Sequence, residues 1–202
     1  MRDKYHHEAL YCGEDATRKL AEVRLIICGA GALGSNLADT LARQGFRQFS
    51  IIDRDRIEEH NVSTQIYGEA DVGAWKVEVL RSHLFRTAGI EIEVVNKELS
   101  ERNVRKLLSK KDNQSHSVII IDAFDNSSSR GLVQKQCRAD GLACLHIGLS
   151  ADYGEVIWDE GYRVPGDQGE DVCDYPMARN LVTMTVSVES LLRSILEGTQ
   201  EN

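Results

Sequence analysis

The stretch Leu25-Ile26-Ile27-Cys28-Gly29-Ala30-Gly31-Ala32-Leu33-Gly34 is an apolar run that breaks directly into the pattern Gly-x-Gly-x-x-Gly. Such a break predicts a strand that turns tightly into a helix. Gly29 would permit the turn, Gly31 would let a phosphate approach the backbone, and Gly34 would let the helix close on the sheet. The first turn of that helix would present unpaired N–H groups to an anion. The stretch therefore favours a nucleotide-binding turn over a purely structural one.

The residues that follow strengthen this interpretation. Apolar side chains at spacings of four predict a helix over 32–44, and Gly45 is placed to end it with a left-handed cap. A second strand is expected at 49–52. Asp53 comes 19 residues after Gly34, where a carboxylate that binds a ribose is expected in this kind of nucleotide site.

Farther along, apolar strand patterns alternate with helical periodicity. Val118 to Ile121 is a continuous β-branched run, which is typical of a strand covered on both faces. The alternation predicts an α/β fold, namely a Rossmann-like doubly wound, mostly parallel sheet with helices on both faces, in a single domain. Further strands are expected at 90–95, 118–121, 142–147 and 155–158, the last two as a hairpin, and further helices at 75–87, 103–109, 127–139 and 178–196.

The expected organisation has four parts. Residues 1–22 are a polar arm, in which 14–21 are expected to form a short helix, and 23–158 are the nucleotide-binding core. Residues 159–177 contain both prolines and are expected to be a mobile crossover loop. Residues 178–202 are expected to form a C-terminal helix that packs on the core.

The amino-acid composition disfavours several classes of partner and of structural motif. With 32 acidic and 24 basic residues among 202, the net charge of −8 disfavours nucleic acid or an anionic membrane as a partner. The sequence contains neither a membrane-spanning apolar run nor a secretory signal, so a cytoplasmic protein is expected. Its five cysteines are odd in number and include no Cys-x-x-Cys. A disulfide framework and the usual structural zinc motif are therefore not indicated.

Polar clusters follow the predicted strands and should meet at one edge of the sheet. They comprise the glycine turn, Asp53 with Asp55, residues 61–65 and the Asp122 region. Lys76 opens a predicted helix, where a cation opposes the helix dipole. We interpret it as a ligand of an ATP phosphate, with a solvated lysine at a frayed helix start as the alternative.

Asp122 and Asp125 follow the predicted central strand. Two carboxylates with this spacing are suited to binding Mg²⁺ or to orienting a substrate amine. The alternative is that Asp125 or Asn126 simply caps the next helix.

In order and spacing these segments resemble the ThiF-like adenylyltransferases, a family that includes ubiquitin-activating enzymes and the activators of the sulfur carriers of molybdopterin and thiamin synthesis. The resemblance extends from residue 23 to about 158. The segments that carry it are 29–34, 53–55, 61–65, 71–78 and 122–126.

The resemblance implies an ATP-dependent enzyme that activates the C-terminal glycine of a ubiquitin-like or sulfur-carrier protein ending in Gly-Gly, and it implies a homodimer. Lys76, Asn61 and Asp125 would carry catalysis. Asp53 would bind the ribose, Asn61 and Lys76 the phosphates, and Asp125 both Mg²⁺ and the carrier's terminal glycine. The implied nucleotide contacts are Gly29, Gly31, Ala32, Gly34, Asp53, Asp55, Asn61, Gln65, Lys76, Asp122 and Arg130.

Cys173 is a further candidate, because some relatives form a thioester or persulfide on a cysteine before the final helix. Asp171 and Asp174 lie close to it in the sequence and disfavour a reactive thiolate. Cys12 is a weaker alternative.

Two departures from the family pattern bear on activity. Thr64 stands where many members have an arginine, and His7 stands where another is expected in the N-terminal arm. Arg43, Arg54, Arg56 and Arg130 are the candidates to replace them. The alternatives are a non-catalytic ThiF-like protein that binds a partner, an NAD-dependent oxidoreductase and a tRNA-modifying dehydratase.

Overall fold

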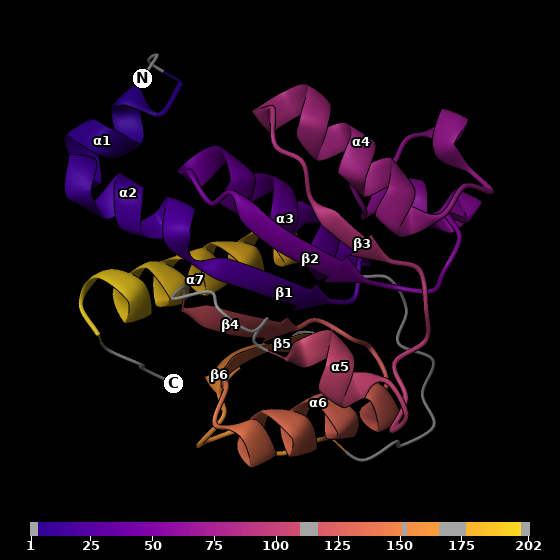
Figure 1. Ribbon diagram of the computed structural model, residues 1–202. Helices are drawn as coiled ribbons and strands as arrows, with labels where there is room; N and C mark the ends of the chain where they lie inside the picture. Colours follow the sequence, from indigo (N-terminus) through magenta and orange to yellow (C-terminus); the bar gives the residue numbers. More distant parts are fainter. Residues whose placement is uncertain (1–3, 110–116, 151–152, 166–176, 199–202) are drawn as a thin grey trace.

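The computed structural model describes residues 4–109, 117–150, 153–165 and 177–198 (Figure 1). Its regular elements, in chain order, are α1 (His6–Cys12), α2 (Glu14–Glu22), β1 (Arg24–Cys28), α3 (Ala32–Gln44), β2 (Gln48–Ile52), the 3₁₀ turns η1 (Glu59–Ser63) and η2 (Glu69–Asp71), α4 (Lys76–Ala88), β3 (Glu93–Val95), α5 (Val104–Leu108), β4 (Val118–Asp122), α6 (Ser127–Asp140), β5 (Ala143–Ser150), β6 (Tyr153–Trp158) and α7 (Met177–Leu196).

The strands form one six-stranded sheet in the order β3-β2-β1-β4-β5-β6. All neighbours are parallel except β5 and β6, which pair antiparallel from Leu145 with Trp158 to Ser150 with Tyr153. The predicted Rossmann-like, mostly parallel sheet in a single domain is confirmed, and the expected hairpin is present as this antiparallel pair. The strand order reverses beside β1, which lies between β2 and β4.

Alternating side chains of β1 build two separate hydrophobic layers. Leu25 and Ile27 face a core shared with α3, α4 and α7, whereas Ile26 and Cys28 face a core shared with α5 and α6. Figure 1 shows α5 and α6 together on one side of the sheet and α3 and α4 on the other. Burial of both faces explains why β1 and β4 are continuous apolar runs in the sequence.

The sequence predicted the bounds of two helices to within one residue. Helix α3 has the expected bounds, and Gly45 ends it in a left-handed conformation with φ of 110°. Helix α4 begins at Lys76 and ends at Ala88, each one residue later than expected, and the next residue, Gly89, is left-handed with φ of 63°. Both glycines therefore act as C-terminal caps, as the sequence predicted for Gly45.

Other expectations differ from the structure. Part of the N-terminal arm is the additional helix α1, next to Tyr5, which is buried and donates from its hydroxyl to the Ala42 carbonyl at 3.3 Å. β3 is only three residues long, because Ile90 and Ile92 pack into the core before pairing begins.

Only part of the expected crossover loop lies among the described residues. In that part, the Tyr162 side chain is buried, at 1% exposed, and the expected mobility of 159–177 stays a prediction. Cys173 lies outside the described residues, and its proposed covalent role stays a prediction.

Candidate functional site

A cavity of about 400 Å³ lies at the carboxyl ends of β1, β2 and β4. Here the strand order reverses, and ligands of open α/β sheets bind at such switch points. The cavity is lined by Gly29, Gly31, Asp53, Arg54, Asp55, Lys76, Lys97, Glu98, Leu99, Ala123, Phe124, Asp125, Asn126, Ser128 and Ser129.

A glycine suits each of the three positions of the turn for a different structural reason. Gly29 has φ of +104°, and a Cβ there would lie 2.7 Å from the Ala123 carbonyl oxygen. A Cβ on Gly34 would lie 2.0 Å from the Gly29 carbonyl oxygen. A Cβ on Gly31 would meet no atom within 4 Å, and Gly31 lines the cavity. Thus Gly29 and Gly34 close the turn, while Gly31 leaves space for a ligand.

The N-terminus of α3 also opens at this turn. Its N-cap residue is Gly31, which offers no side-chain hydrogen bond to the first helical N–H groups. The helix end therefore keeps the donors and the partial positive charge that suit a phosphate.

Asp53 joins the glycine turn to the loop after β2. Its Oδ2 accepts a 2.7 Å hydrogen bond from the Ala30 N–H, and its Oδ1 accepts one of 2.7 Å from the Asp55 N–H. Burial raises the pKa of the Asp53 carboxyl, although these N–H groups and Lys76 act in the opposite direction. The carboxylate thus positions two cavity loops in addition to any contact it makes with a ribose.

Lys76 is brought to the cavity by a short antiparallel contact between the loop after β2 and the start of α4. The Lys76 N–H donates to the Asp55 carbonyl at 3.0 Å, and Arg56 forms a β-bridge with Trp75. The Lys76 Nζ lies 3.7 Å from Asp55 Oδ2, with the lysine side chain 10% exposed and the aspartate 56%. Lys76 is therefore not the solvated lysine of the alternative interpretation.

The loop after β4 supplies a further part of the cavity lining. Asp125 is exposed and lines the cavity, and Asn126 Oδ1 caps α6 by accepting from the Ser129 N–H at 2.9 Å. The cap is therefore Asn126, whose Nδ2 also donates to Asp125 Oδ1 at 3.3 Å, and Asp125 itself does not cap the helix. Exposed carboxylate oxygens at Asp55 and Asp125 are of the donor type that Mg²⁺ prefers.

Six of the eleven predicted nucleotide contacts are not among the residues that line this cavity. Ala32 and Gly34 lie in the first turn of α3. Asn61 is 4% exposed, and its Oδ1 accepts from the Glu58 N–H at 2.9 Å within the η1 turn. Gln65 is 7% exposed. Their roles in nucleotide binding stay predictions, and Asp122 and Arg130 need correction.

Asp122 is completely buried and does not line the cavity. It is the last residue of β4, and its Oδ2 lies 2.8 Å from His146 Nδ1. The expectation that it contacts the nucleotide or pairs with Asp125 on Mg²⁺ is wrong in this structure, because its side chain is buried beside His146.

Arg130 is also buried, at 7% exposed, and its guanidinium is used within the protein. It donates to the carbonyls of Phe124 and Ile147, each at 2.6 Å, and to the Tyr162 hydroxyl at 2.8 Å. Arg130 therefore supports the cavity loop from behind through Phe124, instead of facing the site as the sequence suggested.

Among the four arginines considered as replacements, Arg54 alone lines the cavity. Its Nη1 lies 2.6 Å from Glu98 Oε1. Arg43 pairs with Asp39 on α3 at 2.7 Å, and Arg56 stacks on the Trp75 ring at 3.7 Å. Sequence reasoning missed Lys97, a second lysine in the lining, because no motif marks the chain after β3.

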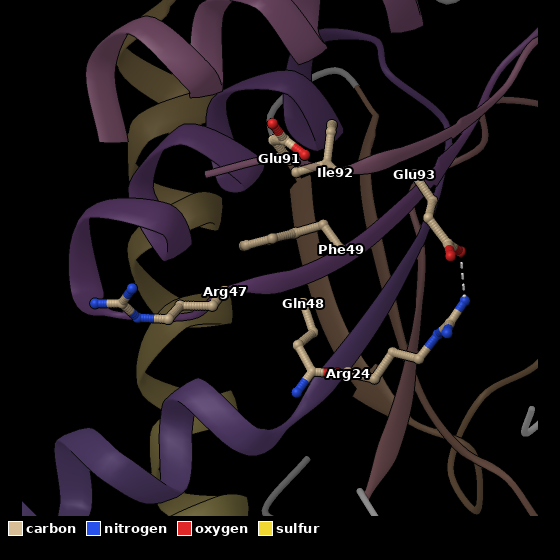
Figure 2. Close-up of a pocket in the computed structure, with 7 residues that line it drawn as sticks. All are labelled: Arg24, Arg47, Gln48, Phe49, Glu91, Ile92 and Glu93. Carbon is tan, nitrogen blue, oxygen red and sulfur yellow. Dashed lines mark hydrogen bonds and ion pairs between the residues drawn. The ribbon is translucent and has the colours of Figure 1, made fainter. Parts of the chain in front are cut away.

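A second cavity, of about 360 Å³, lies at the opposite, amino ends of β1 and β2 and beside β3 (Figure 2). Two of its residues, Arg24 and Glu93, form a 2.8 Å ion pair, and Arg24 also donates to Ser50 Oγ at 2.8 Å. Since ligand sites of open α/β sheets lie at the carboxyl ends of strands, the first cavity is the candidate functional site.

Fold and site together define the class: a Rossmann-like protein whose glycine turn, helix N-terminus and lysines form a cavity suited to a nucleotide. The chain belongs to the ThiF family, which it matches over residues 5–181.

Individual relatives agree with this assignment. The chain is 29% identical over 163 residues to the sulfur carrier protein ThiS adenylyltransferase of Bacillus subtilis (strain 168), covering 76% of this chain and 46% of that protein. It is 30% identical over 132 residues to tRNA threonylcarbamoyladenosine dehydratase 1 of Saccharomyces cerevisiae, covering 64% and 30% respectively. The chain thus spans about half the length, or less, of these curated relatives.

Among solved structures, the E. coli tRNA N6-threonylcarbamoyladenosine dehydratase TcdA in complex with ATP superimposes with a TM-score of 0.68 at 25% identity, covering 74% of this chain and 61% of that one. Within the described part of the chain, no helix is long and apolar enough to cross a membrane.

Proposed function

We propose that the protein is an ATP-dependent adenylyltransferase that activates the C-terminal glycine of a ubiquitin-like or sulfur-carrier protein. The observation that carries the proposal is the convergence of Lys76, Asp125 and the glycine turn on one cavity at the switch point of the sheet. A dinucleotide-dependent oxidoreductase would use the glycine turn and Asp53, but its reaction would require neither Lys76 nor Asp125.

In the proposed reaction, a carboxylate oxygen of the carrier attacks the α-phosphorus of ATP. The bond from that phosphorus to the leaving oxygen breaks, which gives an acyl-adenylate and pyrophosphate. Charge develops on the phosphate oxygens, so the protein has to position the two reactants and to stabilise negative charge. Lys76 and the N-terminus of α3 supply positive potential, and Arg54 and Lys97 are the further cavity cations.

Asp53 is proposed to accept hydrogen bonds from the ribose, and its oxygens already hold the Ala30 and Asp55 N–H groups. Asp125, with Asp55 as a second oxygen donor, is proposed to hold Mg²⁺, which would neutralise phosphate charge when it is bound. Asn61 and Gln65 would need a change in their surroundings to reach a nucleotide, because both are buried.

The partner is proposed to be a small protein ending in Gly-Gly, and the active form is proposed to be a homodimer. Both proposals rest on family membership and on relatives such as the ThiS adenylyltransferase. The similarity to tRNA threonylcarbamoyladenosine dehydratases favours a second candidate, in which a carboxylate on a modified tRNA nucleoside is activated by the same cavity. The net charge of −8 argues against a large tRNA-binding surface on this chain.

The test is ATP–pyrophosphate exchange with candidate carriers, each compared with the same carrier lacking its final two glycines. We expect exchange that depends on the intact carrier, and ATP·Mg²⁺ binding in calorimetry that is tighter than NAD binding. Exchange stimulated by modified tRNA but by no carrier would favour the dehydratase candidate. ATP binding without exchange on any substrate would favour the non-catalytic alternative.

A further inference from the structure

A buried cluster behind the cavity combines a thiol, an imidazole and a carboxylate. Cys144 and His146 lie on the same face of β5, and Asp159 directly follows β6. One ligand atom from each of these residues lies within 4.8 Å of the other two. Cys144 and His146 are fully buried, whereas the Asp159 side chain is 21% exposed. The cluster is therefore enclosed but can be reached from one side.

The separation between the imidazole and the carboxylate fits a tetrahedral ion. His146 Nε2 and Asp159 Oδ1 are 3.2 Å apart. Two donors bound about 2.0–2.1 Å from one tetrahedral zinc ion lie about 3.3 Å from each other. The backbone already holds this geometry, since the Asp159 N–H donates to the Cys144 carbonyl at 3.2 Å.

The surroundings of His146 also match those of a metal ligand. Its Nδ1 is 2.8 Å from Asp122 Oδ2, and its Nε2 faces Asp159 Oδ1. A carboxylate on the second ring nitrogen is the usual partner of a metal-bound histidine. The Tyr162 ring stacks on the imidazole with centroids 3.6 Å apart, which fixes the plane of the ring.

The negative charges around the cluster outnumber the permanent positive ones, so a further cation would be stabilised there. Asp122 and Asp159 face His146, Glu155 lies 3.4 Å from Arg130, and Arg138 Nη2 donates to the Asp159 carbonyl at 3.1 Å, so three carboxylates stand beside two permanent cations. Either His146 is an imidazolium, or a divalent ion is bound with a neutral His146 and a Cys144 thiolate. These two states give the cluster the same net charge, because the ion adds two positive charges while the imidazolium and the thiol each lose a proton. Geometry and donor type favour the ion.

We propose that Cys144, His146 and Asp159 bind a zinc-type divalent ion, with Asp122 orienting His146 and water completing the tetrahedron. A mixed sulfur, nitrogen and oxygen donor set suits Zn²⁺ and disfavours Mg²⁺. This site is separate from the proposed nucleotide cavity and does not depend on the adenylyltransferase proposal. The ion would tie β5 to the end of β6 and, through Asp122, to the strand that leads into the cavity loop.

The probes are zinc and cobalt alone, measured on the full chain with Cys12 and Cys173 replaced by serine to remove two other thiols. We expect one zinc ion per chain by elemental analysis after purification from zinc-supplemented medium. Exchange to Co²⁺ should give a thiolate-to-cobalt charge-transfer band, and chelation should lower the melting temperature. A protein without zinc and without this band would overturn the proposal, as would nuclear magnetic resonance showing a protonated His146 in the zinc-supplemented protein.

Variants assign the ligands. Cys144→Ser should abolish the charge-transfer band, whereas the matched control Cys28→Ser, a buried thiol in the same apolar layer, should keep it. Asp159→Asn changes a partly exposed side chain and should preserve folding while weakening cobalt binding at least about tenfold. Asp122→Asn should weaken it about 10–100-fold, the range for partners of metal ligands. Unchanged cobalt affinity in folded Asp159→Asn and Asp122→Asn proteins would contradict the site.

Discussion

The Lys76 Nζ lies 3.7 Å from Oδ2 of Asp55, while the Lys76 N–H donates to the Asp55 carbonyl at 3.0 Å. One residue therefore positions both the backbone and the ammonium of the cavity lysine. Since the Asp55 carboxylate is 56% exposed, water can solvate it when the lysine is removed. The ion pair therefore positions the Lys76 cation in the cavity and contributes little to the stability of the fold.

From this relationship we predict that Lys76→Ala separates stability from activity. The free energy of unfolding should change by about 1 kcal/mol or less. The rate of ATP–pyrophosphate exchange should fall about 10²-fold or more, because a group that stabilises transition-state charge is lost. The measurements are a denaturant titration and the exchange assay, with Lys135→Ala, an exposed lysine on α6, as control. Full exchange in the Lys76 variant would remove Lys76 from the catalytic set.

Arginine substitutions should distinguish Arg54 from the other candidates. Arg54→Ala should weaken ATP binding about tenfold, on the scale of a lost hydrogen bond to a charged group. Arg43→Ala and Arg56→Ala should leave the affinity unchanged, because their guanidinium groups are used by Asp39 and Trp75 outside the cavity lining. Calorimetric titration with ATP·Mg²⁺ measures all three. Equal effects in all three variants would show that general surface charge, and not Arg54, attracts the nucleotide.

Two alanine substitutions in the glycine turn should have opposite consequences. Gly31→Ala has free space for its Cβ and φ of −80°, so the protein should stay folded while ATP binding weakens about tenfold or more. Gly34→Ala would place its Cβ 2.0 Å from the Gly29 carbonyl oxygen, and we expect it to destabilise the fold by about 3 kcal/mol. Urea unfolding and ATP titration distinguish the two effects. Normal ATP affinity in Gly31→Ala would show that no phosphate approaches this residue.

Asp53→Ala should weaken both nucleotide binding and the fold. Loss of hydrogen bonds to a charged group should reduce ATP affinity by about 1–3 kcal/mol. Stability should also fall, because the Ala30 and Asp55 N–H groups lose their acceptor. Calorimetry and denaturant titration measure the two losses, and Asp53→Asn, which keeps one carbonyl acceptor, should lie between wild type and alanine. A folded alanine variant with normal ATP affinity would leave Asp53 with a purely structural role.

The contact between α3 and α4 through Asp39 should give the protein an acid-sensitive component of stability. Burial alone would raise the pKa of Asp39, but hydrogen bonds from Arg43 and His83 outweigh it and lower the pKa. A lowered folded-state pKa stabilises the protein above the ordinary aspartate value of about 3.9, and this stabilisation is lost as the pH falls through the folded-state value.

The free energy of unfolding should therefore decrease more between pH 5 and pH 2 in the wild type than in Asp39→Asn, by about 0.5–1 kcal/mol. Urea titrations across this range measure the difference. Parallel curves for the two proteins would show that Asp39 titrates alike in the folded and unfolded chains.

The sequence predicted those features whose causes are local. The bounds of α3 follow from its apolar spacing and from Gly45, and the cavity was located because Gly29, Asp53 and Asp125 each follow a strand. The expected strand ended at Ile121, whereas β4 includes Asp122. Asp122 therefore pairs in register with Cys28 and His146, and its side chain is buried. Arg130 was misplaced because its acceptors at Ile147 and Tyr162 lie far along the chain.

The contact between Gly34 and the Gly29 carbonyl also constrains how this loop can diverge. The Gly29 carbonyl oxygen occupies the space that a Cβ on Gly34 would require, so a change at Gly34 cannot be accommodated unless the Gly29 peptide shifts as well. Gly29 cannot shift freely, because a Cβ at that position already meets Ala123 on the neighbouring loop. Substitutions at the two positions should therefore be strongly epistatic. In a random-mutagenesis library selected for folding alone, without any nucleotide, both glycines should persist while Gly31 drifts.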